Sequence, residues 1–363
     1  MMSWCKTCLM PSTRPRMMME DDGRCSACSY RDEYERTDWA ARRAEFLALV
    51  KECKRHPVYD CVVPFSGGKD SAAIAWRLKN ELGLRPLLAT FGQLLWTDVG
   101  RRNWERVRQA GFDIVYWGTD QAVSRKLARR FLIERGHPKN HYDAAVNAVP
   151  LIVASNFGIP LVVYAEHGES CYGGHVLSEA HRRQRDLAEV LENQVGDDAR
   201  NWAVDGLTEA DLYPYIMPDG AAKCTAVYWS FFFRWSIYEN AMLMREKVGF
   251  EGCEPRSDGT FEPWDSVDDG IDGIDYWMMG QKFGFGRAAR MASRLIQLGV
   301  IDRQTGLDLV RKHDHEFPER YFPEVLAYLG MTRAEFMANA DKHREPTIWR
   351  RDGDRWVLRV PPQ

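Results

Sequence analysis

The chain has 363 residues, of which 45% are hydrophobic and 28% are charged, and its formal net charge is −3. This length is enough to bury one large core or two moderate ones, and the composition is ordinary for a globular protein. The small negative charge argues against a nucleic-acid partner, because phosphate-binding surfaces generally carry a basic excess.

Two pairs of cysteines lie near the beginning of the sequence. Each pair has the Cys-x-x-Cys spacing, and together they indicate a structural zinc site in which four thiolates complete a tetrahedron: Cys5, Cys8, Cys25 and Cys28. Glycine and proline between the pairs favour short turns over a helix around the metal. Disulfides are the alternative, but the sequence shows no secretory signal and no transmembrane run, so we expect a cytoplasmic protein without membrane insertion. Residues 1–37 are therefore predicted to form a zinc-ribbon segment.

A glycine-rich loop connects the first predicted strand, residues 58–65, to a predicted helix, residues 71–82. It reads Ser66-Gly67-Gly68-Lys69-Asp70-Ser71. Its two glycines let the main chain approach a phosphate closely, and the helix N-terminus adds partial positive charge. The loop is not a Walker A motif, because Asp70 occupies the Ser/Thr position. We expect it to bind a phosphate group.

Strands and helices alternate through the first half of the chain. After a helix at 39–55, strands are expected at 58–65, 86–91, 112–117 and 160–165, and helices at 71–82, 99–110, 121–135 and 142–157. This alternation predicts an α/β fold with a doubly wound parallel sheet over residues 38–175. Ligands of such sheets sit at the carboxyl ends of the strands, where Phe91 and Glu166-His167 fall.

Past residue 168 the alternation stops, and residues 176–363 are expected to form a largely helical region that binds substrate or a partner. Its aromatic run from Tyr228 to Trp235 is interpreted as a core helix or as a docking face. The segment from Trp349 to Trp356 reads as a two-stranded hairpin.

Two charged runs lie between these segments. Arg287, Arg290 and Arg294 recur at helical spacing, with Lys282 before them, and form either a solvated stripe or a site for a carboxylate or diphosphate of the substrate. The acidic run does not reproduce the EF-hand order, so we expect capped turns in a solvated loop: Asp265, Asp268, Asp269, Asp272 and Asp275.

Several motifs together resemble one enzyme family. They are the cysteine pairs, the loop of residues 66–71, Gly100-Arg-Arg-Asn103, Glu166-His167-Gly168, Tyr172-Gly-Gly174, Lys282-Phe-Gly-Phe-Gly-Arg287 and Glu316-Phe-Pro318. This set is similar to the N-acetyl sugar amidotransferases, PP-loop ATP pyrophosphatases of bacterial surface-polysaccharide and flagellin-glycan biosynthesis. The resemblance implies that ATP adenylates the acetamido oxygen of a glycan precursor sugar and that ammonia displaces AMP, leaving an acetamidino group.

The resemblance also implies cofactors, partners and residue roles. Mg²⁺ would accompany ATP, and ammonia would come from a separate glutaminase subunit, in some cases with a cyclase-like subunit. Ser66, Gly67, Gly68, Lys69, Asp70 and Ser71 would hold the pyrophosphate, Thr90 and Phe91 would border the adenine, and Glu166 and His167 would stand near the reacting centre. We further expect Lys69 and Asp70 to be catalytic and Lys282, Arg287 and Arg290 to bind the substrate.

The sequence departs from the family pattern after the second strand, where Gln93-Leu94-Leu95-Trp96 is apolar. His137 and His141 have helical spacing but no accompanying cysteine, so they remain without an assigned role.

We expect no complete glutaminase in this chain. One class of glutaminase needs a cysteine at its processed N-terminus, whereas this sequence begins Met1-Met2-Ser3, and the other class needs a cysteine in a tight glycine turn, which the residues around Cys171 only half resemble. The alternative enzyme is a PP-loop sulfurtransferase acting on tRNA or a small molecule, with Cys171 as the persulfide-forming residue. A non-enzymatic binding module on an inactive ATPase fold is a third interpretation, against which the intact phosphate loop argues.

Overall fold

A parallel β-sheet of five strands forms the centre of the computed structural model, which describes residues 2–118, 120–175, 178–219 and 223–363. The strand order is β3-β2-β1-β4-β5 and every neighbouring pair is parallel. The strands are β1 (Cys61–Pro64), β2 (Pro86–Phe91), β3 (Asp113–Trp117), β4 (Leu161–Tyr164) and β5 (Thr225–Tyr228). This arrangement confirms the expected α/β fold.

The apolar strand residues alternate between two hydrophobic cores, because successive side chains of a strand point to opposite faces. Val63 belongs to the same core as Ile74 of α3 (Lys69–Asn80), whereas Val62 belongs to the core that contains Val149 of α6 (Asn140–Phe157). Both faces of the sheet are therefore covered, which explains why β1 and β4 read as uninterrupted apolar runs.

The helices of the alternating half lie close to the expected ranges. They are α2 (Trp39–Cys53), α3, α4 (Asp98–Gln109), α5 (Gln121–Arg135) and α6. The chain leaves β1 toward β2 and β3 on one side and returns through α6 to β4 and β5 on the other. The carboxyl ends of β1 and β4 therefore flank the point at which the strand order reverses, where doubly wound sheets bind their ligands.

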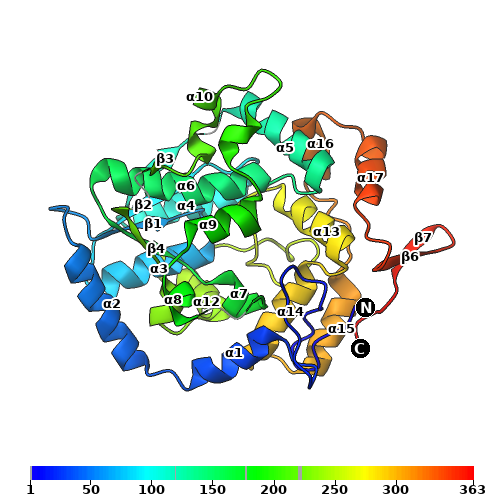
Figure 1. The fold of residues 1–363 in the computed structure, drawn as a ribbon, viewed down its shortest axis with the longest axis horizontal. Helices are drawn as coiled ribbons and strands as arrows, with labels where there is room; N and C mark the ends of the chain where they lie inside the picture. The colour runs from blue at the N-terminus through cyan, green and yellow to red at the C-terminus, as the bar shows by residue number, and fades with distance from the viewer. Residues whose placement is uncertain (1, 119, 176–177, 220–222) are drawn as a thin grey trace.

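The remaining elements are short helices around the sheet and a separate hairpin (Figure 1). They are α1 (Ser26–Glu35), α7 (Gly168–Tyr172), α8 (Glu179–Arg183), α9 (Leu187–Val190), η1 (Leu191–Val195), η2 (Ala199–Trp202), α10 (Glu209–Leu212), η3 (Tyr213–Tyr215), α11 (Trp229–Phe232), α12 (Ile237–Val248), α13 (Asp272–Phe283), α14 (Arg287–Gln297), α15 (Arg303–His313), α16 (Phe322–Leu329), α17 (Arg333–Lys342), β6 (Trp349–Asp352) and β7 (Arg355–Leu358). The β6–β7 hairpin confirms the prediction for this segment, and the region from α7 onward is largely helical.

Two sequence-based expectations about local structure are wrong. The aromatic run does not form one core helix, because Tyr228 ends β5, the four-residue helix α11 follows, and Phe233 is extended. The second cysteine pair is not confined to a turn, since Cys25 caps α1 and Cys28 lies within that helix.

The N-terminal segment packs on the C-terminal region, and in Figure 1 it lies beside α14 and α15 with both termini on the same side of the molecule. The Trp4 indole donates a hydrogen bond to the Val360 carbonyl at 2.9 Å, and the Thr13 hydroxyl donates to the Phe283 carbonyl at 2.6 Å. Within the described residues, no helix combines the length and apolarity that crossing a bilayer requires.

Candidate functional site

The glycine-rich loop ends at an open helix N-terminus. Gly67 has φ +98°, a conformation that strains any residue with a side chain, so glycine is needed there. Gly68 is the N-cap of α3, and among the described residues no side chain caps it. The Ser66 hydroxyl accepts a hydrogen bond from the Gly68 amide at 3.1 Å and fixes the turn. The first amides of α3 therefore have the arrangement that suits an anion.

Lys69 and Asp70 form a fixed ion pair in the first turn of α3. The Lys69 ammonium lies 2.7 Å from an Asp70 carboxylate oxygen, and the second Asp70 oxygen accepts a hydrogen bond from Asn240 of α12 at 2.8 Å. Burial opposes the charge of Lys69, but Asp70 and Asp265 outweigh it and raise the pKa of this lysine. Lys69 is therefore a buried, permanently charged cation beside the open helix end.

Two adjoining cavities open at the carboxyl ends of β1 and β4. The smaller cavity, of about 560 Å³, is lined by the glycine-rich loop of residues 66–71, which we call the phosphate loop for its predicted ligand. The larger cavity, of about 1140 Å³, extends along α6 toward the N-terminal segment. They share wall residues that include Ser66, Tyr142, Glu166, Tyr172 and Arg290. One continuous site therefore lies at the point where the strand order reverses.

Glu166 lies on the wall common to both cavities. The Tyr172 hydroxyl donates to its carboxylate at 3.4 Å, and burial together with the charge of Asp70 raises the pKa of Glu166. Glu166 therefore lies close to the glycine-rich loop of residues 66–71.

His167 borders the larger cavity and caps α7. Its Nδ1 accepts hydrogen bonds from the Ser170 amide at 3.2 Å and from the Ser170 hydroxyl at 2.7 Å, and burial lowers the pKa of His167 to about 3. The ring is therefore neutral and carries its proton on Nε2. His167 holds the turn that follows Glu166.

The two residues at the end of β2 that were expected to border the adenine, Thr90 and Phe91, differ in their position relative to the cavities. Phe91 lines the larger cavity, and its ring packs against Tyr142 and Tyr215. The Thr90 hydroxyl instead accepts a hydrogen bond from the Trp104 indole at 3.3 Å, and Thr90 is absent from the described lining of both cavities. Only Phe91 of this pair borders the site.

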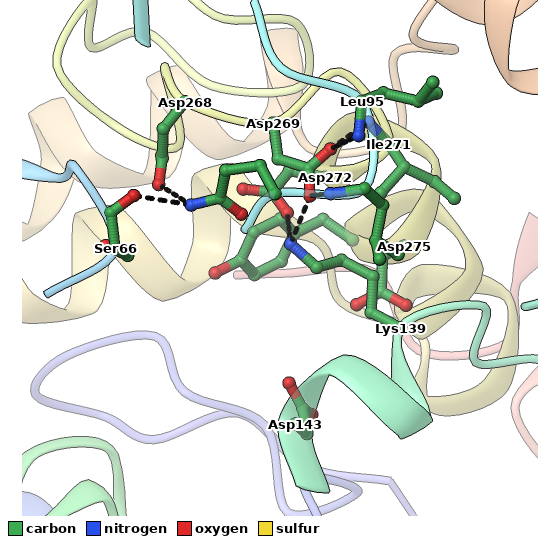
Figure 2. Close-up of polar contacts among 12 residues, drawn as sticks. Ser66, Leu95, Lys139, Asp143, Asp268, Asp269, Ile271, Asp272 and Asp275 are labelled. Carbon is green, nitrogen blue, oxygen red and sulfur yellow. Dashed lines mark hydrogen bonds and ion pairs between the residues drawn. The ribbon is translucent and has the colours of Figure 1, made fainter. Parts of the chain in front are cut away.

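Asp268 and Asp269 are buried opposite the glycine-rich loop, and the other three aspartates of the acidic run are only partly exposed, so the expectation of a solvated loop is wrong. Figure 2 shows Lys139 of the α5–α6 connection reaching Asp269, at 3.1 Å, and Asp272. Asp269 also accepts hydrogen bonds from the amides of Leu94 and Leu95 at 3.1 and 3.0 Å. This carboxylate therefore anchors the loop after β2 to the start of α13.

Asp268, Asp269 and Asp272 form the acidic wall of the site. Gln93 connects this wall to the phosphate loop by hydrogen bonds. Its amide nitrogen donates to the Ser66 carbonyl at 2.7 Å and to the Asp268 carboxylate at 2.6 Å, whereas its buried Oε1 has no hydrogen-bond partner among the described residues. Burial and the neighbouring Asp272 raise the pKa of Asp268 to about 7. The wall facing the loop therefore brings carboxyl groups close together, which disfavours ionisation of Asp268.

The predicted substrate-binding cations of the C-terminal region differ in whether they pair with a carboxylate of the protein. Arg287, which is 4% exposed, pairs with Asp265 at 2.7 Å and donates to the Asp258 carbonyl at 3.1 Å, so its charge is used inside the protein. Arg290 lies over the Tyr172 ring at 4.3 Å and, like Lys282, has no carboxylate partner among the described residues. Lys282 of α13 and Arg290 of α14 therefore line the larger cavity with positive charge.

The four N-terminal cysteines converge as the sequence predicted. Their sulfur atoms lie within 4.8 Å of one another, and the sulfur–sulfur distance is 3.4 Å between Cys8 and Cys25 and 3.8 Å between Cys5 and Cys28. A tetrahedral Zn²⁺ with bonds of about 2.3 Å requires sulfur atoms about 3.8 Å apart, whereas a disulfide requires about 2.0 Å. This donor set therefore fits a structural metal such as zinc and excludes disulfides.

Three residues have no assigned role, and of these His137 lines the larger cavity. Cys171 is buried and is not among the residues that line either of the two cavities. Burial raises the pKa of its thiol to about 11. His137 lies between Asp275 and Asp143, at 2.7 and 3.1 Å. The ring of His141 is buried and accepts or donates a hydrogen bond with the Ser124 hydroxyl at 3.0 Å.

Comparison with known proteins connects the C-terminal region to a biosynthetic family. Residues 258–360 match the model of the C-terminal domain of WbpG-like lipopolysaccharide biosynthesis proteins. A search of curated proteins returned no match. The matched segment supplies the wall that faces the phosphate loop, including Asp268, Asp272 and Arg290. The similarity supports a context of polysaccharide biosynthesis for this site.

Proposed function

We propose that this protein is an ATP-dependent amidotransferase of lipopolysaccharide biosynthesis, which converts an acetamido group of a precursor sugar to an acetamidino group. One observation carries the proposal. The open N-terminus of α3, with its buried Lys69, faces a wall supplied by the WbpG-like segment, and both line the same cavity. A phosphate-binding loop and a polysaccharide-biosynthesis segment thus contribute to one site.

In the first step, the acetamido oxygen attacks the α-phosphorus of ATP. An oxygen–phosphorus bond forms, the bond between the α- and β-phosphates breaks, and pyrophosphate leaves. The main-chain amides that follow Gly67 and the Lys69 ammonium receive the charge of the departing pyrophosphate, which is a form of electrostatic stabilisation.

The acidic wall fits the Mg²⁺ that accompanies ATP in such reactions. Mg²⁺ prefers oxygen ligands, and Asp268 and Asp272 are carboxylates of the smaller cavity whose pKa values are raised by burial and that Lys139 neutralises only in part. Asp268 and Asp272 would hold the ion, with the Oε1 of Gln93 beside them. When bound, Mg²⁺ supplies positive charge to the phosphate oxygens.

In the second step, the nitrogen of ammonia attacks the imidate carbon. A carbon–nitrogen bond forms, the carbon–oxygen bond breaks, and AMP leaves with the former acetamido oxygen. Glu166 accepts the proton that the attacking nitrogen loses, because its raised pKa makes it a stronger base than an exposed carboxylate. Ammonia itself would come from a separate glutaminase subunit.

The environment of Cys171 favours amide chemistry over the alternative of sulfur transfer. A persulfide-forming cysteine must reach the activated substrate as a thiolate. Cys171 is 5% exposed, its pKa is raised, and it borders a small separate pocket with Tyr30 and Tyr34.

The proposal is tested by incubating the protein with ATP, Mg²⁺, ammonium and a panel of acetamido sugars, free, phosphorylated and nucleotide-linked. We expect AMP and pyrophosphate in equal amounts with a sugar product that has an imino group in place of one oxygen. Formation of ADP and phosphate, or turnover with sulfide but not with ammonium, would refute it.

A further inference from the structure

A loop of the N-terminal segment forms part of the wall of the larger cavity. Arg14 and Arg16 lie between the two cysteine pairs, and both line this cavity together with Lys282 and Arg290. Arg16 is paired with Glu169 at 2.5 Å. Arg14 donates hydrogen bonds to the carbonyls of Gly173 and Pro15. The cysteine site therefore holds in place a loop that reaches the proposed active site.

Three elements bring Arg14, Lys282 and Arg290 to this wall, and we name these residues the cation cluster. Arg14 bonds the Gly173 carbonyl, while Arg290 lies over the ring of the preceding residue, Tyr172. The hydrogen bond from the Thr13 hydroxyl to the Phe283 carbonyl places the residue next to Arg14 against the residue next to Lys282. Members of the cluster are therefore neighbours although they are far apart in sequence.

The positive charge of the cluster is offset only in part by the described residues, because Glu169 acts on Arg14, Asp275 on Lys282, and Asp265 and Glu166 on Arg290, in each case without an ion pair. Among the described residues, no member of the cluster forms an ion pair with a carboxylate, whereas Arg16 of the larger cavity and Arg287 of the smaller cavity each do. Burial and, after it, the nearby guanidinium of Arg290 lower the pKa of Arg14 to about 10. Folding brings like charges together here at an energetic cost.

We propose that the cation cluster binds a phosphoryl group carried by the acceptor sugar, so that Arg14 of the metal-held loop is a substrate-binding residue. A group with more than one negative charge offsets several unpaired cations at once, and guanidinium groups match phosphate oxygens in geometry. The phosphates of ATP belong at the head of α3, in the smaller cavity, where Lys69 already provides their cation. This inference rests on the proposed function, because it assigns the larger cavity to the acceptor.

The test separates the acceptor phosphoryl group from those of ATP. The protein is saturated with α,β-methylene-ATP and Mg²⁺, which fills the phosphate loop, and inorganic phosphate is then titrated and followed by calorimetry. We expect binding that Arg14→Gln and Lys282→Gln each weaken by about tenfold, since a hydrogen bond to a charged group is worth about 1.5 kcal/mol or more. Arg14→Lys should retain most of the affinity.

Arg36→Gln is the matched control, because Arg36 is exposed at the end of α1 and lies outside the described lining of both cavities. Zinc content measured on each variant shows that the segment is still folded. Phosphate affinity that is unchanged in Arg14→Gln, or phosphate binding that the ATP analogue abolishes, would overturn the inference.

The anion site can be tested separately if the proposed function fails. If the ATP analogue does not bind, phosphate is titrated into the nucleotide-free protein, and Arg14→Gln is compared with Lys69→Ala. Weakening by Arg14→Gln supports the anion site even then, and equal affinity in wild type and Arg14→Gln contradicts it.

Discussion

Lys69 and Arg287 are both buried cations of the site wall, but the residues around them give them different tasks. Arg287 is surrounded by Asp265 and main-chain carbonyls, so it stabilises the loop before α13. Within the part of the chain that the structure describes, Lys69 has one carboxylate partner, Asp70, and stands beside amides that no side chain caps. Spacing along the sequence indicated cations at both positions, but only the contacts distinguish them.

Removal of the Lys69 charge should slow the adenylation step. Lys69→Ala is expected to reduce kcat/KM for AMP formation by more than about a hundredfold, equivalent to a loss of about 3 kcal/mol of transition-state stabilisation. The exposed Lys51 of α2 provides the control, because Lys51→Ala removes the same charge away from the site. Equal kcat/KM values for the two variants would exclude a role for Lys69.

His137 gives the protein a stabilising ion pair that depends on pH. Burial opposes its charge, but Asp275 and Asp143 outweigh burial and raise the pKa of His137 to about 10 in the folded protein. Since the pKa of an unfolded histidine is about 6.5, the stabilisation is complete below that pH and is lost as the pH rises toward 10.

We therefore expect the free energy of unfolding of wild type to exceed that of His137→Gln at pH 6, and the difference to shrink steadily by pH 10. Urea denaturation at several pH values measures both. A difference that stays constant over this range would contradict the proposed charge of His137.

At the scale of elements, local signals predicted bounds well and tertiary contacts explain the failures. Helix α5 occupies the expected residues because Asp120 caps its start and Gly136, with φ +60°, ends it. Strand β5 was missed because a run of only four residues cannot be assigned from periodicity, and its pairing with β4 decides its structure. The acidic run appeared solvated because Lys139, which pairs with it, lies far away in sequence.

The cysteine site should contain about one equivalent of zinc, because four thiolates in tetrahedral arrangement complete its coordination. Cys25→Ser should lower zinc content and solubility, since the segment around it is too small to fold alone. Nucleotide binding should change less, because the N-terminal segment lies outside the described lining of the smaller cavity. Elemental analysis and binding of the ATP analogue measure these effects. Wild-type protein free of zinc would remove the assignment.

At the scale of the whole molecule, the site is built from distant parts of the chain. The sheet provides the phosphate loop and Glu166, the WbpG-like segment provides the acidic wall and Arg290, and the N-terminal segment provides Arg14. The sequence predicted the first contribution because its motifs are local. It could not predict Gln93, Lys139 or Arg14, since their places depend on how these parts pack.

A separate source of ammonia leads to a prediction about pH and partner. The protein alone should use ammonium, fail with glutamine, and use glutamine once its glutaminase is added. Because ammonia rather than ammonium is the nucleophile, the ammonium-supported rate should rise toward alkaline pH more steeply than the rate with the glutaminase. Steady-state rates at several pH values test this, and glutamine-dependent turnover by the protein alone would contradict it.

Transfer of oxygen from sugar to nucleotide is the most direct measurement of the central claim. An acetamido sugar that supports turnover is labelled with ¹⁸O in its carbonyl group, and AMP is analysed by mass spectrometry after reaction with ATP and ammonium. If the amide oxygen attacks the α-phosphorus, the label appears in AMP and disappears from the sugar. Label that remains in the sugar, or that appears in inorganic phosphate together with ADP, would contradict the account.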